Sequence, residues 1–195
     1  MQLGDAAQIF SGRPIRRAGD TEAFRSVRIV GLRDIGRQIT PPTELEEARV
    51  SETDDSSRSA LRPGDVVVTA RGSNVRAAVA TPEHEGVLAG SNLIVIRLEA
   101  DIPPEMIAAY LRHPEISARL LRDFVGSSTA GFTIDSLRRI ELELTAPDCA
   151  AQLAELVKRV DAYADHQRKV IELRQTAADE AIFTHLEPRD RRASL

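Results

Sequence analysis

The sequence predicts an α+β protein in which a compact, mixed-sheet domain is followed by one long C-terminal helix. Two β-branched or apolar runs, at residues 66–68 and 92–98, are typical of buried strands. Pro103 and Pro104 precede a run with helical spacing, because proline is tolerated where the first helical N–H groups have no partner. From residue 150 onward, apolar residues recur at threes and fours, which indicates a helix.

The first sixty residues give weaker signals. Residues 1–10 predict a short strand or helix that leads into a turn at residues 11–14, and the basic stretch 13–17 is expected to be an exposed loop. A strand is predicted at residues 27–30. Residues 40–60 are acidic and lack apolar periodicity, so we expect a mobile loop there.

Residues 61–73, which read LRPGDVVVTARGS, are the clearest local motif. Pro63 and Gly64 predict a tight turn, and the valines that follow predict a strand. With a second strand at residues 75–80, the motif forms a hairpin with a polar tip, comprising Arg71, Gly72, Ser73, Asn74 and Arg76. Guanidinium, hydroxyl and amide groups suit phosphates and base edges. The alternative is a hairpin loop that is polar only because it faces water.

Two further helices and a last strand are expected before the long helix. The first places Met106, Ile107, Tyr110 and Leu111 on one face and ends before Pro114. The second directs Ile116, Leu120, Leu121 and Phe124 inward and ends near Gly126, which opens a small polar loop at residues 126–131. Residues 140–144 alternate apolar and acidic residues, as a half-buried strand does.

We divide the chain into a domain at residues 1–149, a long helix at 150–185 and a disordered tail at 186–195. An uninterrupted helix over residues 150–184 is roughly 52 Å long, which exceeds the width of a small domain. It must project and pair with another helix or lie across its own domain. We favour pairing, although Gln167 and Arg174 interrupt the apolar stripe.

Composition excludes several classes of protein. The single cysteine, Cys149, excludes an internal disulfide, and no apolar run resembles a signal peptide or a membrane span, so we expect a soluble, cytoplasmic protein. The four histidines lack metal-ligand spacing, and nucleotide-binding fingerprints are missing. We therefore expect neither catalysis nor a bound cofactor. The net charge of −4 argues against a strongly basic nucleic-acid binder, but arginines are concentrated in residues 1–40.

Three separated stretches together resemble the specificity subunits of type I restriction–modification systems. They are LRPGDVVVTARGS, SNLIVIRLEADIPPEMIAAYL, and GSSTAGFTIDSLRRIELELTAP followed by Gln152 and the long helix. In that family, two target-recognition domains are held apart by two long antiparallel helices, and the enzyme reads a split DNA sequence. The resemblance implies that this chain is a half-subunit, with one domain and one helix that forms an antiparallel coiled coil with a partner.

The resemblance also implies roles for particular residues. Arg71, Gly72, Ser73, Asn74 and Arg76 at the hairpin, with Ser127, Ser128 and Thr129, become candidates for facing DNA, and Arg13, Arg16 and Arg17 become candidates for contacting phosphates. The residues expected to form the dimer contact are Leu153, Leu156, Val157, Val160, Tyr163, Ala164, Val170 and Ile171.

The function that follows is sequence-specific recognition of double-stranded DNA without catalysis. Methylation and cleavage would come from a methyltransferase subunit, which binds S-adenosylmethionine, and from a translocase/endonuclease subunit. The chain would act as a homodimer or with a second half-subunit at a bipartite site. The alternative is a protein-interaction scaffold of the same fold that does not read DNA, which the acidic net charge favours.

Overall fold

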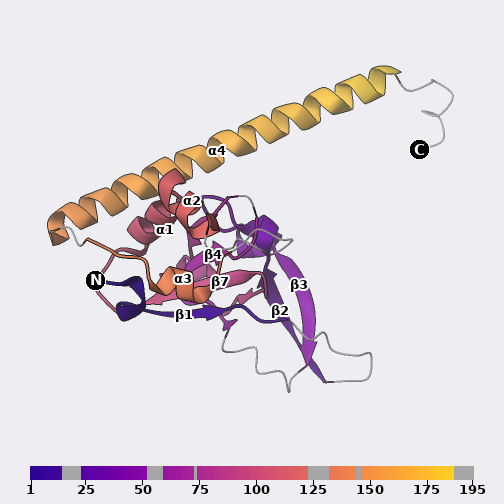
Figure 1. Ribbon diagram of the computed structural model, residues 1–195. Coiled ribbons are helices and arrows are strands. Elements are labelled where there is room, and N and C mark those ends of the chain that lie inside the picture. Colours follow the sequence, from indigo (N-terminus) through magenta and orange to yellow (C-terminus); the bar gives the residue numbers. More distant parts are fainter. Residues whose placement is uncertain (15–22, 52–58, 73, 123–131, 144–145, 187–195) are drawn as a thin grey trace.

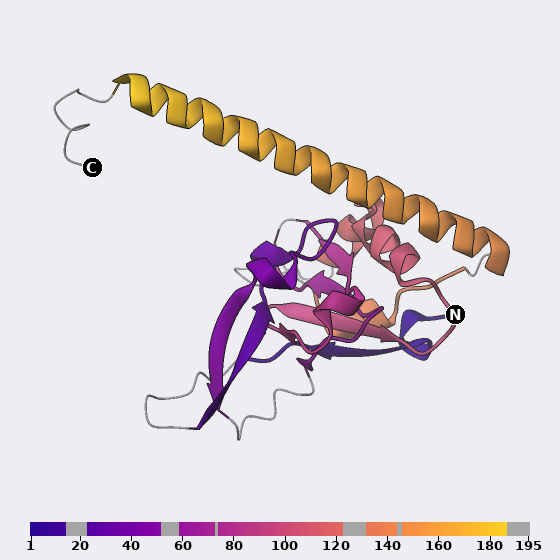
Figure 2. The same ribbon diagram turned by 180° about the vertical axis from the view of Figure 1, so that it is seen from behind.

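The computed structural model describes residues 1–14, 23–51, 59–72, 74–122, 132–143 and 146–186. Two β-sheets and three short helices form a domain, and one long helix, α4 (Pro147–Leu186), lies across one side of it (Figure 1). Seen from behind in Figure 2, α4 continues well past the edge of the domain. The predicted α+β class and the long C-terminal helix are therefore confirmed.

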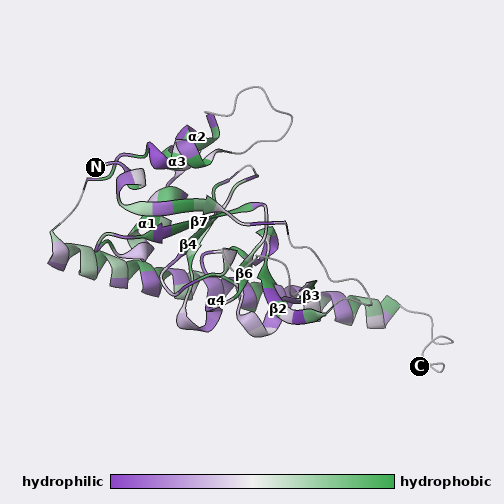
Figure 3. Ribbon diagram, turned by 90° about the horizontal axis from the view of Figure 1, so that it is seen from below, coloured by the Kyte–Doolittle hydropathy of each residue, from purple (hydrophilic) through white to green (hydrophobic). Residues whose placement is uncertain are grey.

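The larger sheet has four antiparallel strands in the order β1 (Ala7–Ser11), β7 (Leu93–Leu98), β4 (Val66–Thr69) and β5 (Ala77–Val79). Its central strands separate two apolar cores. Val66 and Val68 of β4 face one core, which includes α1 and α2 residues, whereas Val67 faces the other. Successive strand residues point to opposite faces, so a strand buried on both sides reads as a continuous apolar run. Figure 3 shows β4 and β7 as predominantly hydrophobic.

The smaller sheet contains β3 (Glu46–Ser51), β2 (Phe24–Val30) and β6 (Leu88–Ala89), in that order. The prediction of a mobile loop over residues 40–60 was wrong for β3, which pairs antiparallel with β2 along its whole length. Ala48 and Val50 are buried on one face of β3, and Arg49 between them is exposed. This alternation stabilises a strand despite the acidic composition. Residues 52–58 lie outside the described residues.

Short 3₁₀ turns at Leu32–Asp34, Pro42–Glu44 and Pro82–His84 lie between strands, and another at Leu3–Asp5 precedes β1. The two predicted helices are α1 (Pro104–Arg112) and α2 (Pro114–Arg122), and Ile107, Leu111 and Leu120 are buried as expected. Phe124 and Gly126 lie outside the described residues.

The segment before α4 differs from its prediction. A short helix, α3 (Ile134–Arg138), was not expected, and the Thr133 hydroxyl caps it by accepting the Ser136 N–H. The predicted strand at 140–144 is reduced to one bridge between Gln2 and Glu141. Ile140 is nevertheless buried and Glu141 exposed, so the predicted alternation of faces holds where the segment is described.

Helix α4 begins three residues earlier than predicted, at Pro147, and is roughly 60 Å long. Its first half lies against its own domain, where Ala150, Ala154 and Asp161 are buried. Every residue from 171 to 186 is exposed. The helix therefore lies across its own domain and also projects from it.

Candidate nucleic-acid interface

The loop between β4 and β5 is closed by two hydrogen bonds between Thr69 and Arg76. The Thr69 N–H donates to the Arg76 carbonyl at 2.9 Å, and the Arg76 N–H donates to the Thr69 hydroxyl at 3.1 Å. Arg71, Gly72 and Asn74 are exposed beyond this closure. Gly72 has φ +124°, a conformation that side-chain-bearing residues rarely adopt. The predicted hairpin therefore presents an exposed guanidinium and an exposed amide, while Ser73 lies outside the described residues.

Arg76 differs from Arg71 because it has an internal partner. Although Arg76 is exposed, its guanidinium donates to the Ile35 carbonyl at 3.1 Å. This bond connects the hairpin to the loop that follows β2. Arg76 therefore supports the shape of the hairpin, and its assignment to DNA remains a prediction.

The turn that precedes β4 is held by Asp65, whose carboxylate accepts the Arg62 N–H at 2.8 Å. The same carboxylate forms a bidentate ion pair with Arg97 of β7, at 2.9 Å to Nε and 2.7 Å to Nη2. The Asp65 side chain is 2% exposed. Gly64 adopts φ +86°, as the predicted turn requires.

A basic cavity of about 700 Å³ is lined in part by residues of β1 and β7. Its lining includes Arg13, Arg62 and Arg97, and the Arg97 guanidinium lies 5.3 Å from the centre of the Phe10 ring. Arg13 is exposed, and its N–H donates to the Ala89 carbonyl at 3.1 Å. Of the other loop residues predicted to contact DNA, Arg16, Arg17, Ser127, Ser128 and Thr129 lie outside the described residues.

Sequence reasoning missed a second exposed feature, a two-stranded ribbon made of β2 and β3. The ribbon extends away from α4, on the opposite side of the domain (Figure 1). On its outer face, the Arg49 guanidinium carbon lies 3.7 Å from the centre of the Phe24 ring. Phe24 is 43% exposed, which is unusual for a large aromatic side chain. A two-stranded ribbon has the width that a DNA major groove admits.

The exposed apolar face of α4 carries five of the eight residues predicted for the dimer contact. Leu153, Leu156, Val160, Tyr163 and Ile171 are between 40% and 66% exposed. We call residues 153, 156, 160, 163, 167, 170, 174, 177 and 181 the α4 seam, because their spacing alternates three and four residues as in a coiled coil. Gln167 and Arg174 make its second half locally polar.

The remaining three predicted contact residues are half-buried. Val157 and Ala164 lie three residues after Ala154 and Asp161, so they share the face that packs on the chain's own domain. Val170 belongs to the seam by its spacing. Exposed Leu173 and Phe183 were not predicted, and both lie off the seam.

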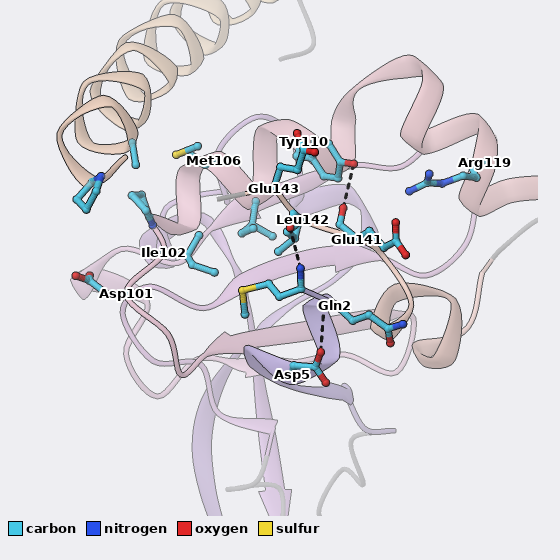
Figure 4. Close-up of a pocket in the computed structure, with 15 residues that line it drawn as sticks. Gln2, Asp5, Asp101, Ile102, Met106, Tyr110, Arg119, Glu141, Leu142 and Glu143 are labelled. Carbon is cyan, nitrogen blue, oxygen red and sulfur yellow. Dashed lines mark hydrogen bonds between the residues drawn. The ribbon is translucent and has the colours of Figure 1, made fainter. Parts of the chain in front are cut away.

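A larger cavity of about 990 Å³ lies near the start of α4, at the other end of the domain from the ribbon (Figure 4). Met106 and Ile102 contribute apolar surface, and Glu141 and Glu143 contribute carboxylates. Figure 4 shows the Tyr110 hydroxyl donating to the Glu141 carbonyl, at 3.4 Å. None of the residues predicted to bind DNA lines this cavity.

Within the described part of the chain, no group of three or more histidine, cysteine or acidic side chains is placed to hold a metal ion. Among the helices in those same ranges, none is both long and apolar enough to cross a membrane.

No family model matches the sequence, and no curated protein matches it. Solved structures do match. A chain from a structure of type I restriction–modification complex assembly and conformational transition has a TM-score of 0.61 at 21% identity, over 94% of this chain and 46% of its own length. The HsdS subunit from Thermoanaerobacter tengcongensis has a TM-score of 0.59 at 19% identity, over 94% of this chain and 46% of its own.

A third match is the type I restriction–modification S subunit from M. genitalium, with a TM-score of 0.56 at 14% identity, over 92% of this chain and 43% of its own. The chain thus spans about half the length of the structures that it matches. The domain, the two sheets and the long helix together form the fold of a type I specificity subunit, over about half of that subunit's length.

Proposed function

We propose that this chain is a non-catalytic DNA-recognition subunit of a type I restriction–modification system, built as a half-subunit that pairs with a second copy. The observation that carries the proposal is a fold match to a type I restriction–modification structure over 94% of the chain, with a TM-score of 0.61. The α4 seam is the surface that a second copy would cover, because its apolar residues have coiled-coil spacing and point away from the domain.

In this proposal, two copies pair through antiparallel α4 helices and place one domain at each end. Two-fold symmetry of the protein is mirrored in the DNA, so the site would be an inverted repeat with a fixed gap. The chain would direct a methyltransferase subunit, which supplies S-adenosylmethionine binding, and a translocase/endonuclease subunit to that bipartite site.

Each domain would contact DNA through the hairpin loop and through the ribbon of β2 and β3. Arg71 and Asn74 at the hairpin loop offer a guanidinium and an amide, which suit guanine and adenine edges respectively. Arg49, held over the Phe24 ring, provides a cation whose position is already fixed before DNA binds. Arg13 is assigned to the phosphate backbone, where a charge is sufficient and base geometry is not read.

Two measurements on the purified chain test this function. Light scattering should give a dimer for the natural chain and a monomer for Leu156→Asp, which places a carboxylate on the α4 seam. Ala162→Asp is the matched control, because Ala162 is exposed on α4 but lies off the seam. Loss of dimer in both variants, or in neither, would contradict pairing through the seam.

The second measurement is selection of duplexes from a random DNA pool by the purified chain, followed by gel-shift titration at several salt concentrations. We expect an inverted repeat to be enriched, with affinity that falls steeply with salt because phosphate contacts release counterions. A pool that stays random after selection, with the chain alone and with its methyltransferase, would refute DNA recognition.

The net charge of −4 favours a second candidate, a protein-interaction scaffold of the same fold. Such a scaffold would bind the methyltransferase subunit but would bind DNA weakly at every salt concentration. The salt titration therefore separates the two candidates in one experiment.

A further inference from the structure

One acidic residue of α4 is buried between two arginines of the domain. The Asp161 carboxylate accepts from Arg112 Nη2 at 2.6 Å and from Arg37 Nη1 at 3.0 Å. Its side chain is only 10% exposed, although Asp161 lies on a helix that is otherwise largely exposed. We call Asp161, Arg37 and Arg112 the helix clamp.

The helix clamp connects α4 to three separate parts of the domain. Arg112 is the last residue of α1, and it also donates to the Ala77 carbonyl of β5 at 2.9 Å. A further bond, at 3.2 Å, reaches the Arg37 carbonyl in the loop after β2. Ala77 is the first residue of β5, the second strand of the hairpin that carries Arg71, so the clamp is bonded directly to that hairpin.

Two further ion pairs flank the clamp along α4. Lys158 pairs with Glu105 of α1 at 3.1 Å, and Lys169 lies 3.8 Å from Glu44. Between them, Gly36 packs so closely on α4 that an added Cβ would lie 2.9 Å from Arg168 Nη1. Contacts on both sides of Asp161 therefore define a docked segment of α4.

A buried ion pair of this kind fixes a position more than it adds stability, since the desolvation of the charges offsets much of their attraction. Arg112 Nε is buried without a hydrogen-bond partner among the described residues, which is a further cost of keeping an arginine there. If α4 slipped by one residue, its face would turn by about 100° and bring Val160 or Ala162 to the arginines. Neither side chain can accept a hydrogen bond, so the clamp selects one register of α4 on the domain.

We propose that the helix clamp determines the gap length of the DNA site, because it fixes the angle and register between the domain and the helix that separates the two domains. This inference rests on the proposed function. It assigns to Asp161, Arg37 and Arg112 a positioning role: they contact no DNA and act by holding the DNA-contacting surfaces at one separation.

The test uses a series of DNA duplexes. Each duplex carries the two selected half-sites in inverted orientation, and the gap between them is one base pair longer in each successive duplex. Asp161→Asn keeps the shape of the side chain and removes its charge. Arg37→Gln is the milder variant, because the Arg37 side chain is 45% exposed and its loss leaves Arg112 in place. Glu155→Gln is the control, since it removes an exposed ion pair with Arg159 that lies entirely within α4.

For the natural chain and Glu155→Gln, we expect one preferred gap and weaker binding at neighbouring gaps. In both clamp variants, the ratio of affinities between the preferred gap and its neighbours should fall toward one, while affinity for a single half-site stays unchanged. A merely structural role would instead lower binding to all duplexes in parallel and leave the ratio intact, and that result would overturn the inference. If Asp161→Asn does not fold, Arg37→Gln gives the decisive ratio.

The proposed function and this inference fail in different ways. A natural chain that binds no half-site refutes both. A natural chain that binds a half-site but prefers no gap refutes the clamp's role and leaves DNA recognition standing.

Discussion

Replacing Asp65 by Asn should destabilise the domain strongly, although the two side chains have nearly the same shape. Asp65 is almost completely buried, and both of its oxygens bind the Arg97 guanidinium, at 2.7 and 2.9 Å. Asn keeps one acceptor, which can retain the Arg62 N–H, but it leaves the Arg97 charge without a counterion. Arg97 itself is 18% exposed, so water can compensate only part of that loss.

Removing one partner of a buried ion pair costs about 3–5 kcal/mol, and the partial exposure of Arg97 places this case near the lower end, at about 3 kcal/mol. For a chain of this length, that loss corresponds to a fall in Tm of roughly 6–12 °C. Urea unfolding followed by circular dichroism measures the change in the free energy of unfolding. Protein concentration is held constant because self-association also changes apparent stability.

Asp135→Asn is the matched control, because Asp135 pairs with Arg138 on the surface of α3, where the two side chains are 69% and 54% exposed. Exposed pairs contribute little, so this variant should change stability by less than about 0.5 kcal/mol. The reasoning would be refuted if Asp65→Asn lost no more stability than Asp135→Asn at an unchanged urea m-value.

Two further changes are predicted. Gly12→Ala should lower Tm markedly, because the added Cβ would lie 2.2 Å from the Gly90 carbonyl oxygen, whereas Gly31→Ala, with 3.5 Å to the nearest atom, should be nearly neutral in the same thermal melt. Arg49→Gln should weaken DNA binding and reduce the slope of log affinity against log salt by about one unit, as for loss of one phosphate contact. Arg138→Gln, on exposed α3, should leave that slope unchanged, and equal slopes for both variants would contradict a role for the ribbon.

Much of the domain was predictable because its central strands are buried on both faces. Val66, Val67 and Val68 belong to two different cores, and a strand in that position can be built only from apolar residues. Pro104 likewise marked the start of α1, and Pro114, which was predicted to end that helix, occupies the first position of α2.

The missed elements are those whose buried residues are few or charged. In β3, only Ala48, Val50 and Ser51 are buried, so the apolar alternation is too short to predict a strand among the neighbouring glutamates. Helix α3 has five residues, fewer than two turns, so its periodicity cannot be detected in the sequence. The docking of α4 depends on Asp161, and a search for apolar spacing assigns a buried aspartate to the solvent face.

The candidate interface likewise contains one part that was predictable from the sequence and one that was not. The Arg71 hairpin was predictable because a turn motif and a β-branched strand define where its tip must be. The ribbon was not, because the contact between Arg49 and Phe24 joins residues that only strand pairing brings together. Arg76 was chosen for its charge, and only the fold reveals that its guanidinium already has a backbone partner.

Because the outer half of α4 is exposed, the helix content of the chain should depend on whether another molecule packs against that half. Residues 171–186 are all exposed, and an isolated helix of that length is only marginally stable in water. When the protein is diluted, this segment should therefore lose its helical structure first. The magnitude of the ellipticity at 222 nm should fall as the protein concentration falls, while the two sheets remain folded. Proteases should cleave there in the free chain, so resistance of the segment to trypsin gives a simple readout of whether another molecule is covering it.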